Sequence, residues 1–190
     1  MRGGMGGYST LGVLVPWWQN FLIGDPNMTD NPKNEKVVIY GASGHGKVIA
    51  DILVKSGKQV RAFVDDNEAL WDRVFYGSPV WKGTHRLKEN AEKEAFSVII
   101  AVGNNQTRWK IQQELEAMGI GFGTALHPSA QVANDVVIGE GTVVMANSVI
   151  NPGARVGTHC IINTAATVDH DCIIGNFVHL SPGAHLGVSM

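Results

Sequence analysis

The second half of the chain carries a branched aliphatic residue at every sixth position, without a gap, from residue 126 to residue 186. These positions are Leu126, Val132, Ile138, Val144, Ile150, Val156, Ile162, Val168, Ile174, Leu180 and Leu186. The fifth residue of each hexad is mostly small or medium in size, and Gly or a short polar residue often fills the second position. Such a six-residue repeat predicts a parallel β-helix, in which each coil stacks on the next and buries a shared core.

Before residue 124 the pattern changes to short apolar runs that alternate with helical spacing. Strands are predicted at residues 36–40, 59–64 and 97–102, and helices at residues 48–56 and 107–118. A strand, a glycine-rich turn, a helix and a second strand form a βαβ unit, which implies a parallel sheet. The sequence therefore predicts a small Rossmann-like α/β domain at residues 35–124, followed by a β-helix domain at residues 125–190.

Residues 1–34 follow neither pattern. Residues 1–9 are glycine-rich, and the apolar run over residues 10–24 contains Pro16, Trp17 and Trp18. This run is shorter than the about 20 apolar residues that span a bilayer, and it lacks the small-x-small site of a signal peptide. We expect residues 1–34 to be a leader, a tag or a wrongly assigned upstream extension without ordered structure, with Met28 as the natural start. A membrane anchor is the alternative.

Charge and cysteine usage narrow the class of partner and compartment. The formal net charge is −2 and Lys and Arg form no cluster, which argues against nucleic acid and an anionic membrane as partners. Cys160 and Cys172 share the inward fifth position of the repeat, but two hexads separate them. If three hexads make one coil, these thiols lie on different faces and cannot form a disulfide. Free core thiols fit a reducing compartment, so we expect a cytoplasmic protein.

A glycine-rich turn joins the first predicted strand to the first helix. Gly41, Gly44 and Gly46 let the backbone approach a ligand closely, and N–H groups at a helix N-terminus suit a phosphate. Asp65 ends the next predicted strand, near where dinucleotide-binding folds keep the acid that binds ribose, but the glycine spacing differs from theirs. The turn favours a nucleotide or nucleotide-sugar site, and an NAD site and a purely structural turn remain open. His45 could bond a phosphate or a sugar hydroxyl.

The repeat also contains histidines, at His159, His170, His179 and His185. His170 occupies an outward corner of its hexad, between Asp169 and Asp171. A carboxylate beside an imidazole raises its basicity and fixes its tautomer, as a general base requires. A solvated corner histidine is one alternative. A zinc site between subunits is another, but the spacings between these histidines match no zinc pattern, and we expect no metal.

In combination these features resemble one family. The α/β segments Gly41-Ala-Ser-Gly-His-Gly46, Asp65-Asp66 and Gly103-Asn104-Asn105, followed by hexads with His170-Asp171, are similar to bacterial sugar acetyltransferases of the sialic-acid O-acetyltransferase type. That family includes N-acetyltransferases for UDP-4-amino-sugars in bacillosamine synthesis and for GDP-perosamine. The resemblance covers residues 36–190 and implies a left-handed β-helix and a homotrimer with active sites between subunits. It also implies acetyl-CoA as co-substrate and a nucleotide-linked amino sugar or sialic acid as acceptor, for surface glycan synthesis.

The resemblance assigns roles to individual residues. It implies His170 as the catalytic base, Asp171 as its acidic neighbour, Asn163 as a further catalytic-site residue and His179 near the acetyl-CoA thioester. The implied nucleotide-sugar site consists of Ser43, Gly44, His45, Asp65, Asp66 and Gly103. In the implied reaction His170 takes a proton from the sugar amine or hydroxyl as it attacks the acetyl-CoA carbonyl, and coenzyme A leaves as a thiol. Backbone N–H groups stabilise the oxyanion.

The repeat stops inside a hexad at Met190, whereas members of this family continue for further coils and a closing element. A solenoid without an end cap exposes its core and its strand edges. We therefore expect a chain truncated at its C-terminus, as a fragment or a frameshifted reading, with an incomplete coenzyme site. A trimeric binding or scaffold protein without activity and an NAD-dependent enzyme are the alternatives to the acetyltransferase.

Overall fold

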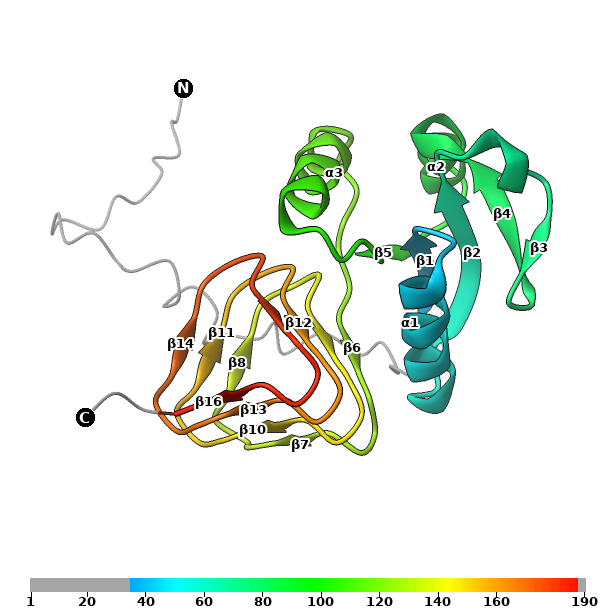
Figure 1. The fold of residues 1–190 in the computed structure, drawn as a ribbon. Coiled ribbons are helices and arrows are strands. Elements are labelled where there is room, and N and C mark those ends of the chain that lie inside the picture. Colours follow the sequence, from blue (N-terminus) through cyan, green and yellow to red (C-terminus); the bar gives the residue numbers. More distant parts are fainter. Residues whose placement is uncertain (1–34, 188–190) are drawn as a thin grey trace, which may run out of the picture. The chain divides into compact units, whose positions relative to one another are not determined.

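The computed structural model describes residues 35–187, so the predictions for residues 1–34 and for the chain end at Met190 lie outside the described residues. The first part alternates strands and helices (Figure 1). Its elements are β1 (Lys36–Tyr40), α1 (Gly44–Lys55), β2 (Gln59–Asp65), the 3-10 helix η3 (Glu68–Leu70), β3 (Val74–Phe75), β4 (Ser78–Lys82), α2 (Gly83–Ala91), β5 (Ser97–Ile100) and α3 (Asn105–Ala117). All the predicted strands and helices are present. Elements β3, β4 and α2 lie where the sequence predicted none.

Helices α1 and α3 begin earlier than predicted because a polar side chain caps each N-terminus. Ser43 precedes α1, and its hydroxyl oxygen accepts a hydrogen bond from the backbone N–H of Gly46 at 3.4 Å. Asn104 precedes α3, and its side-chain oxygen accepts from the backbone N–H of Thr107 at 2.9 Å. Such caps satisfy N–H groups that have no partner within the first helical turn. The glycine-rich turn and the Gly103 segment therefore each lead directly into a helix N-terminus.

The sheet has the strand order β3-β4-β2-β1-β5, and all its pairings are parallel except that of β3 with β4. Side chains of β1 alternate between two apolar layers, as in any strand buried on both faces. Val37 and Ile39 pack with α1 on one face, and Val38 and Tyr40 pack with residues of α2 and α3 on the other. The predicted parallel α/β part is thus a sheet with helices on both faces.

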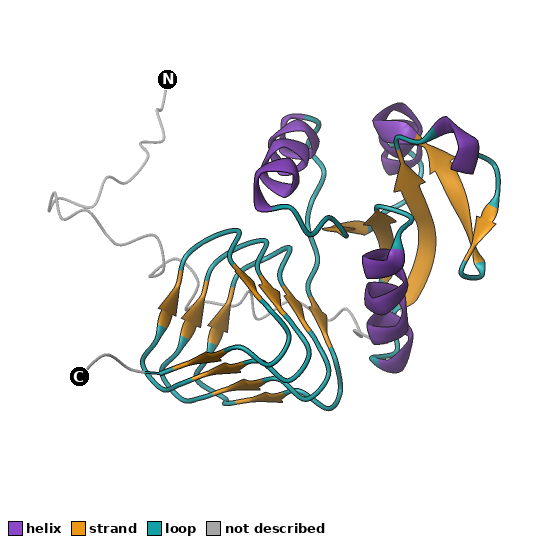
Figure 2. Ribbon diagram, viewed as in Figure 1, coloured by secondary structure: helices purple, strands orange, loops and turns teal. Residues whose placement is uncertain are grey.

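The second part is a parallel β-helix (Figure 2), in which three coils contain three two-residue strands each and the last described coil contains two. The strands are β6 (Ala125–Leu126), β7 (Gln131–Val132), β8 (Val137–Ile138), β9 (Val143–Val144), β10 (Val149–Ile150), β11 (Arg155–Val156), β12 (Ile161–Ile162), β13 (Thr167–Val168), β14 (Ile173–Ile174), β15 (His179–Leu180) and β16 (His185–Leu186). Strands three hexads apart pair, as Ile150 does with Val168. They form three faces, which we call the β15 face (β6, β9, β12, β15), the β16 face (β7, β10, β13, β16) and the β14 face (β8, β11, β14). The predicted coil of three hexads is confirmed.

The second residue of each strand is the aliphatic residue of the repeat, and it points into the core. Val144, Ile162 and Val168 have no exposed surface. Cys160 is buried among them, Cys172 packs against the same cluster, and both thiols are free, as predicted. Burial of branched aliphatic side chains at about 25 cal/mol per Å² of apolar area is what stabilises each coil on its neighbours.

The outward side of the β15 face belongs to a second core that includes helix α1. The first residues of β6, β9 and β12 are Ala125, Val143 and Ile161, and each is at most 1% exposed. They share a cluster with Ile49 and Leu53 of α1. The corresponding residue of β15 is His179, which ends this apolar row with a polar ring. Packing of α1 on the β15 face therefore places the α/β part beside the coil that carries His179.

Candidate functional site

The predicted nucleotide-sugar residues lie at the carboxyl ends of the parallel strands. The chain leaves β1 for β2 on one side, whereas β5 pairs with β1 on the other side, so the strand order reverses between β1 and β5. Ligands in open α/β sheets bind at such a reversal, outside the carboxyl ends of the strands. The turn with Ser43, Gly44 and His45 follows β1, and Gly103 follows β5. Asp65 ends the adjacent strand β2.

Gly46 lets the turn after β1 fold back on itself. A side chain at this position would collide with the carbonyl oxygen of Gly41 and press on the ring of Phe63 at 3.3 Å. Asp65 holds the same turn, because one of its carboxylate oxygens accepts the backbone N–H of Ala42 at 2.8 Å. Part of the glycine signature is therefore a structural requirement, and it coexists with the predicted ligand role.

The neighbouring carboxylates are both engaged within the chain. The other oxygen of Asp65 accepts the backbone N–H of Asn67 at 2.9 Å. Both oxygens of Asp66 lie 2.8 Å from the hydroxyl of Tyr40, which donates to them. Burial and this carboxylate raise the pKa of Tyr40 far above its usual range, so the phenol remains a donor at every working pH. Each carboxylate oxygen keeps a second acceptor position, and Asp66 is exposed to solvent.

His45 projects from the first turn of α1 and is partly buried. Its Nε2 atom is inaccessible to solvent and has no hydrogen-bond partner among residues 35–187. Burial, with smaller contributions from the charges of His179 and Arg108, lowers the pKa of His45 to about 4. The imidazole is therefore neutral at pH 7. A buried ring nitrogen without a partner is uncommon in folded proteins and is a candidate contact for a bound ligand.

His179 is held by a side chain from the coil below. Its Nε2 lies 3.0 Å from Nδ2 of Asn163, while Oδ1 of Asn163 accepts the backbone N–H of Thr164 at 2.8 Å. Because the amide oxygen is engaged in this way, the amide nitrogen donates to His179, and the ring proton is assigned to Nδ1. The structure thus brings together Asn163 and His179, two of the predicted site residues, within electrostatic reach of a third, His45.

His170 lies at the corner between β13 and β14 and is 59% exposed. Its Nδ1 is 2.8 Å from Oδ2 of Asp171, and its backbone N–H donates to Oδ1 of Asp169 at 2.8 Å. The hydrogen bond with Asp171, followed by the charge of Asp169, raises the pKa of His170 above its ordinary value. The side chain of Asp171 therefore reaches the imidazole of His170.

His170 and His179 occupy different parts of the β-helix. His170 precedes β14, whereas His179 begins β15, so the β14 face and a corner separate them within the chain. The described residues therefore present two half-sites. One contains His45, Asn163 and His179, and the other contains His170 and Asp171.

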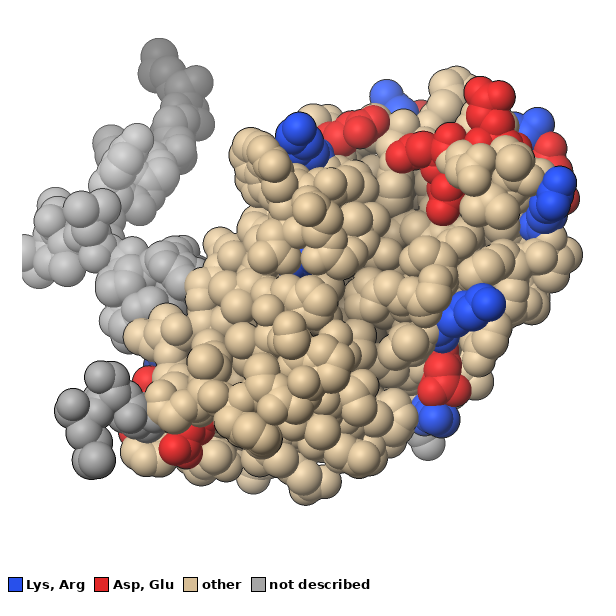
Figure 3. All heavy atoms as spheres, viewed as in Figure 1, with Lys and Arg blue, Asp and Glu red and all other residues tan. Residues whose placement is uncertain are grey.

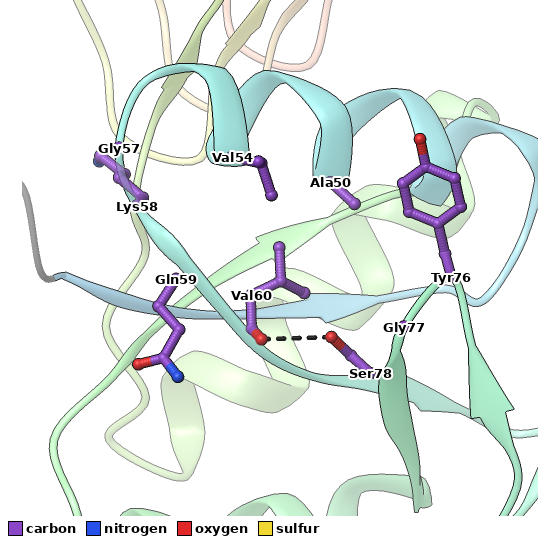
Figure 4. Close-up of a pocket in the computed structure, with 9 residues that line it drawn as sticks. All are labelled: Ala50, Val54, Gly57, Lys58, Gln59, Val60, Tyr76, Gly77 and Ser78. Atoms are coloured by element: carbon purple, nitrogen blue, oxygen red, sulfur yellow. Dashed lines mark hydrogen bonds between the residues drawn. The ribbon is translucent and has the colours of Figure 1, made fainter.

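A separate pocket of about 510 Å³ lies near the amino end of strand β2 (Figure 4). It is bounded by the C-terminal half of α1, by Gln59 and Val60 at the start of β2, and by the β3–β4 turn. Ser78 donates to the carbonyl of Val60 at 3.3 Å across its floor. Because ligands of parallel sheets bind at the carboxyl ends of the strands, this pocket is not part of the candidate site.

Metal, membrane and charge features add little to the site. Among residues 35–187, no three His, Cys, Asp or Glu side chains are grouped so that they could hold a metal ion. No helix in this part of the chain has the length and apolar character needed to cross a membrane. On the face shown in Figure 3, acidic and basic side chains intermingle over the α/β elements, and most of the visible β-helix surface carries neither.

Comparisons with known proteins agree with this arrangement. Residues 36–115 match the family described as the PglD N-terminal domain, and residues 135–170 match the bacterial transferase hexapeptide family. The chain is 42% identical over 121 residues to UDP-N-acetylbacillosamine N-acetyltransferase of Bacillus subtilis (strain 168), covering 59% of this chain and 52% of that protein. It therefore spans about half the length of this curated relative.

Two solved structures are similar over more of their length. The acetyltransferase domain of PglB from Neisseria gonorrhoeae is 40% identical with a TM-score of 0.72, covering 81% of this chain and 74% of that one. PerB from Caulobacter crescentus, in complex with CoA and GDP-perosamine, is 37% identical with a TM-score of 0.74, covering 79% and 70%.

A PglD-type α/β part followed by hexapeptide coils defines a class of sugar-modifying transferases with a left-handed β-helix, which confirms the predicted fold class. The chain belongs to the family of bacterial sugar acetyltransferases that includes the PglB acetyltransferase domain and perosamine N-acetyltransferase.

Proposed function

We propose that this chain transfers an acetyl group from acetyl-CoA to the amine of a nucleotide-linked amino sugar. The observation that carries the proposal is the position of His45. It lies in the glycine-rich turn after β1, and it is close enough to His179, which bonds Asn163, for the two imidazoles to interact electrostatically. This position supports a site that would hold the nucleotide phosphates at the turn after β1 and the reacting groups beside Asn163 and His179 on the β-helix. Relatives of at least 37% identity include one described with acetyl coenzyme A and one with CoA and GDP-perosamine.

In the proposed reaction His170 is the general base. Its proton-accepting atom is Nε2, because Nδ1 is hydrogen-bonded to Asp171 at 2.8 Å. The imidazole takes a proton from the sugar amine as the nitrogen attacks the thioester carbonyl. The C–S bond then breaks, and the imidazolium returns the proton to the sulfur, so that coenzyme A departs as a thiol. The carboxylate of Asp171 stabilises the imidazolium that forms. Ser43, Gly44, His45, Asp65, Asp66 and Gly103 are the proposed contacts of the nucleotide sugar, and His179 is the proposed contact near the thioester.

The proposed enzyme is a homotrimer in which a neighbouring subunit completes each site. This proposal follows from the separation of His170 from His179, because a base must lie within hydrogen-bond reach of the proton that it abstracts. In a ring of subunits related by rotation, the His170 corner of one chain can face the β15 side of the next. We also propose that the protein is cytoplasmic, that residues 35–124 and 125–190 act as its two domains, and that no metal takes part.

The direct test measures release of coenzyme A with a thiol reagent. Acetyl-CoA is supplied with UDP- and GDP-linked amino sugars, and free sialic acid is the competing acceptor. We expect turnover with a nucleotide-linked amine and a loss of about 10²–10⁴-fold in kcat for His170→Ala. His185→Ala is the matched control, because His185 is another exposed histidine of the repeat and, among residues 35–187, its Nδ1 bonds the hydroxyl of Thr167. Near-normal activity of His170→Ala would refute the assignment of the base.

A further inference from the structure

Arg108, on helix α3, is the only Lys, Arg, Asp or Glu among residues 35–187 that is fully buried, with 1% of its surface exposed. A buried cation normally needs a carboxylate partner. Arg108 forms no ion pair with any described carboxylate, and its nearest acceptors are neutral oxygens. Burial lowers its pKa, but a guanidinium still stays protonated at neutral pH. Among the described residues, five hydrogen bonds to neutral oxygens surround its positive charge.

Three of its hydrogen bonds fix the segment between β5 and α3. Nη1 donates to the carbonyl of Val102 at 2.8 Å and to that of Gly103 at 3.1 Å. Nη2 donates to Oδ1 of Asn105 at 2.9 Å. Gly103 is one of the proposed nucleotide-sugar contacts, so the guanidinium determines the path of the backbone at that contact.

The remaining two hydrogen bonds cross to the β-helix. Nε donates to the carbonyl of His159 at 2.8 Å, and Nη2 donates to the carbonyl of Phe177 at 2.7 Å. His159 and Phe177 occupy stacked corners of successive coils, and their rings lie parallel with centroids 5.2 Å apart. Phe177 lies shortly before His179 in the same coil. All five N–H groups of the guanidinium are thus used, and together they join the two substrate regions of the site.

We propose that Arg108 is a positioning residue that sets the distance between the nucleotide-sugar segment at Gly103 and the coil that carries His179. This inference rests on the proposed acetyltransferase function. The rigid planar fork of arginine makes bonds in fixed directions, whereas a lysine ammonium is a point charge on a flexible stem. A bound acceptor must reach the thioester in a near-attack geometry, and a shift of about 1 Å between the two regions can reduce the rate about 10²-fold.

The test compares Arg108→Met and Arg108→Lys with Arg61→Met. Arg61 is a matched control because it makes an ion pair with Glu94 at 2.6 Å, on β2, away from both substrate regions. We expect kcat to fall at least about tenfold in both Arg108 variants, with the KM for acetyl-CoA within about twofold of wild type, because each region keeps its own contacts. Lysine should not rescue kcat, and Arg61→Met should leave it unchanged.

Amide hydrogen exchange gives a second readout that does not depend on turnover. Loss of the fork should speed exchange about tenfold at the N–H groups of His159 and Phe177, whose carbonyls accept from it, and of Thr107, which bonds the Asn104 cap between the acceptors Gly103 and Asn105. Unchanged exchange at any of these three amides would overturn the proposal, and so would a normal kcat in Arg108→Met or full rescue by lysine. Inactivity of the wild-type protein toward all acceptors would refute the proposed function instead. Amide hydrogen exchange would then still test whether Arg108 holds the Gly103 segment and the coil with His179 together. If Arg108→Met does not fold, Arg108→Lys carries the same comparison.

Discussion

Mixing two inactive variants should restore activity if neighbouring subunits share each site. One variant is His170→Ala, which removes the proposed base. The other is His179→Ala, which removes the ring that bonds Asn163 at 3.0 Å. Because the β14 face and a corner separate the two histidines in one chain, we infer that a working site takes His170 from one subunit and His179 from the next.

The expected recovery follows from this geometry. In a ring assembled at random from equal amounts of the two variants, the subunit that supplies His170 to an interface retains this histidine in half of the cases. The subunit that supplies His179 retains that histidine in half of the cases as well. About one quarter of all interfaces therefore regain both histidines, whatever the number of subunits in the ring. The mixture should reach about 25% of wild-type kcat, far above the value of either variant alone.

The assay is coenzyme A release after the two chains are co-expressed or refolded together. Chains that are mixed only after separate assembly serve as one control. A second control pairs His170→Ala with the double variant His170→Ala/His179→Ala, which cannot rebuild any site. Activity of the co-assembled mixture that stays at the average of its parents would refute a shared site and would require both histidines to act from one chain.

Three further predictions concern the base, the turn and the core. Asp171→Asn replaces the charged carboxylate that raises the pKa of His170 with a neutral amide, so the acidic limb of the kcat/KM profile should move to lower pH while the plateau falls. Gly46→Ala places a methyl group against backbone and should cost about 1–3 kcal/mol in thermal unfolding, whereas Gly44→Ala, with open space around it, should not destabilise the fold. Ile162→Ala leaves a cavity in the fully buried β-helix core and should cost about 2–5 kcal/mol in urea unfolding.

Each of these has an outcome that would contradict it. An acidic limb that stays in place in Asp171→Asn would mean that the limb does not report on His170. Equal stability of the two glycine variants would contradict the close contact at Gly46. Ile173 is 77% exposed, so Ile173→Ala should change the free energy of unfolding by less than about 0.5 kcal/mol. If Ile162→Ala also changed the free energy of unfolding by less than about 0.5 kcal/mol, the core position of Ile162 would be contradicted.

The β-helix could be predicted from sequence because its core position accepts little besides branched aliphatic residues. Ile150, Ile162 and Val168 repeat the same contact in successive coils, so the period survives as a simple rule. The stretch from residue 67 to 96 carries no such signal. Strand β4 contains a proline and a single fully buried residue, Val80, and α2 buries only Leu87 and begins without a side-chain cap. Local periodicity therefore could not reveal these elements.

The predictability of the site residues depends on how local their contacts are. His170 and Asp171 are adjacent in sequence, so a contact between them could be expected from the dipeptide, and Nδ1 of His170 lies 2.8 Å from Oδ2 of Asp171. Arg108 is different, because its acceptors at His159 and Phe177 lie 51 and 69 residues away. These acceptors are backbone carbonyls, which every residue carries. No sequence pattern could identify Arg108 as a link, and only the fold reveals it.

The apolar row of Ala125, Val143 and Ile161 ends at His179. The number of coils in this row therefore sets how far His179 lies along the β-helix. Stacked strands lie about 4.8 Å apart, so each coil that is inserted or removed below β15 would move His179 by about that length relative to His45. Repeat proteins generally tolerate whole added repeats, because each contacts only its neighbours. In the proposed mechanism, a chain lengthened by one perfect coil of three hexads would keep its fold but misplace His179, so that mechanism requires the present number of coils below β15.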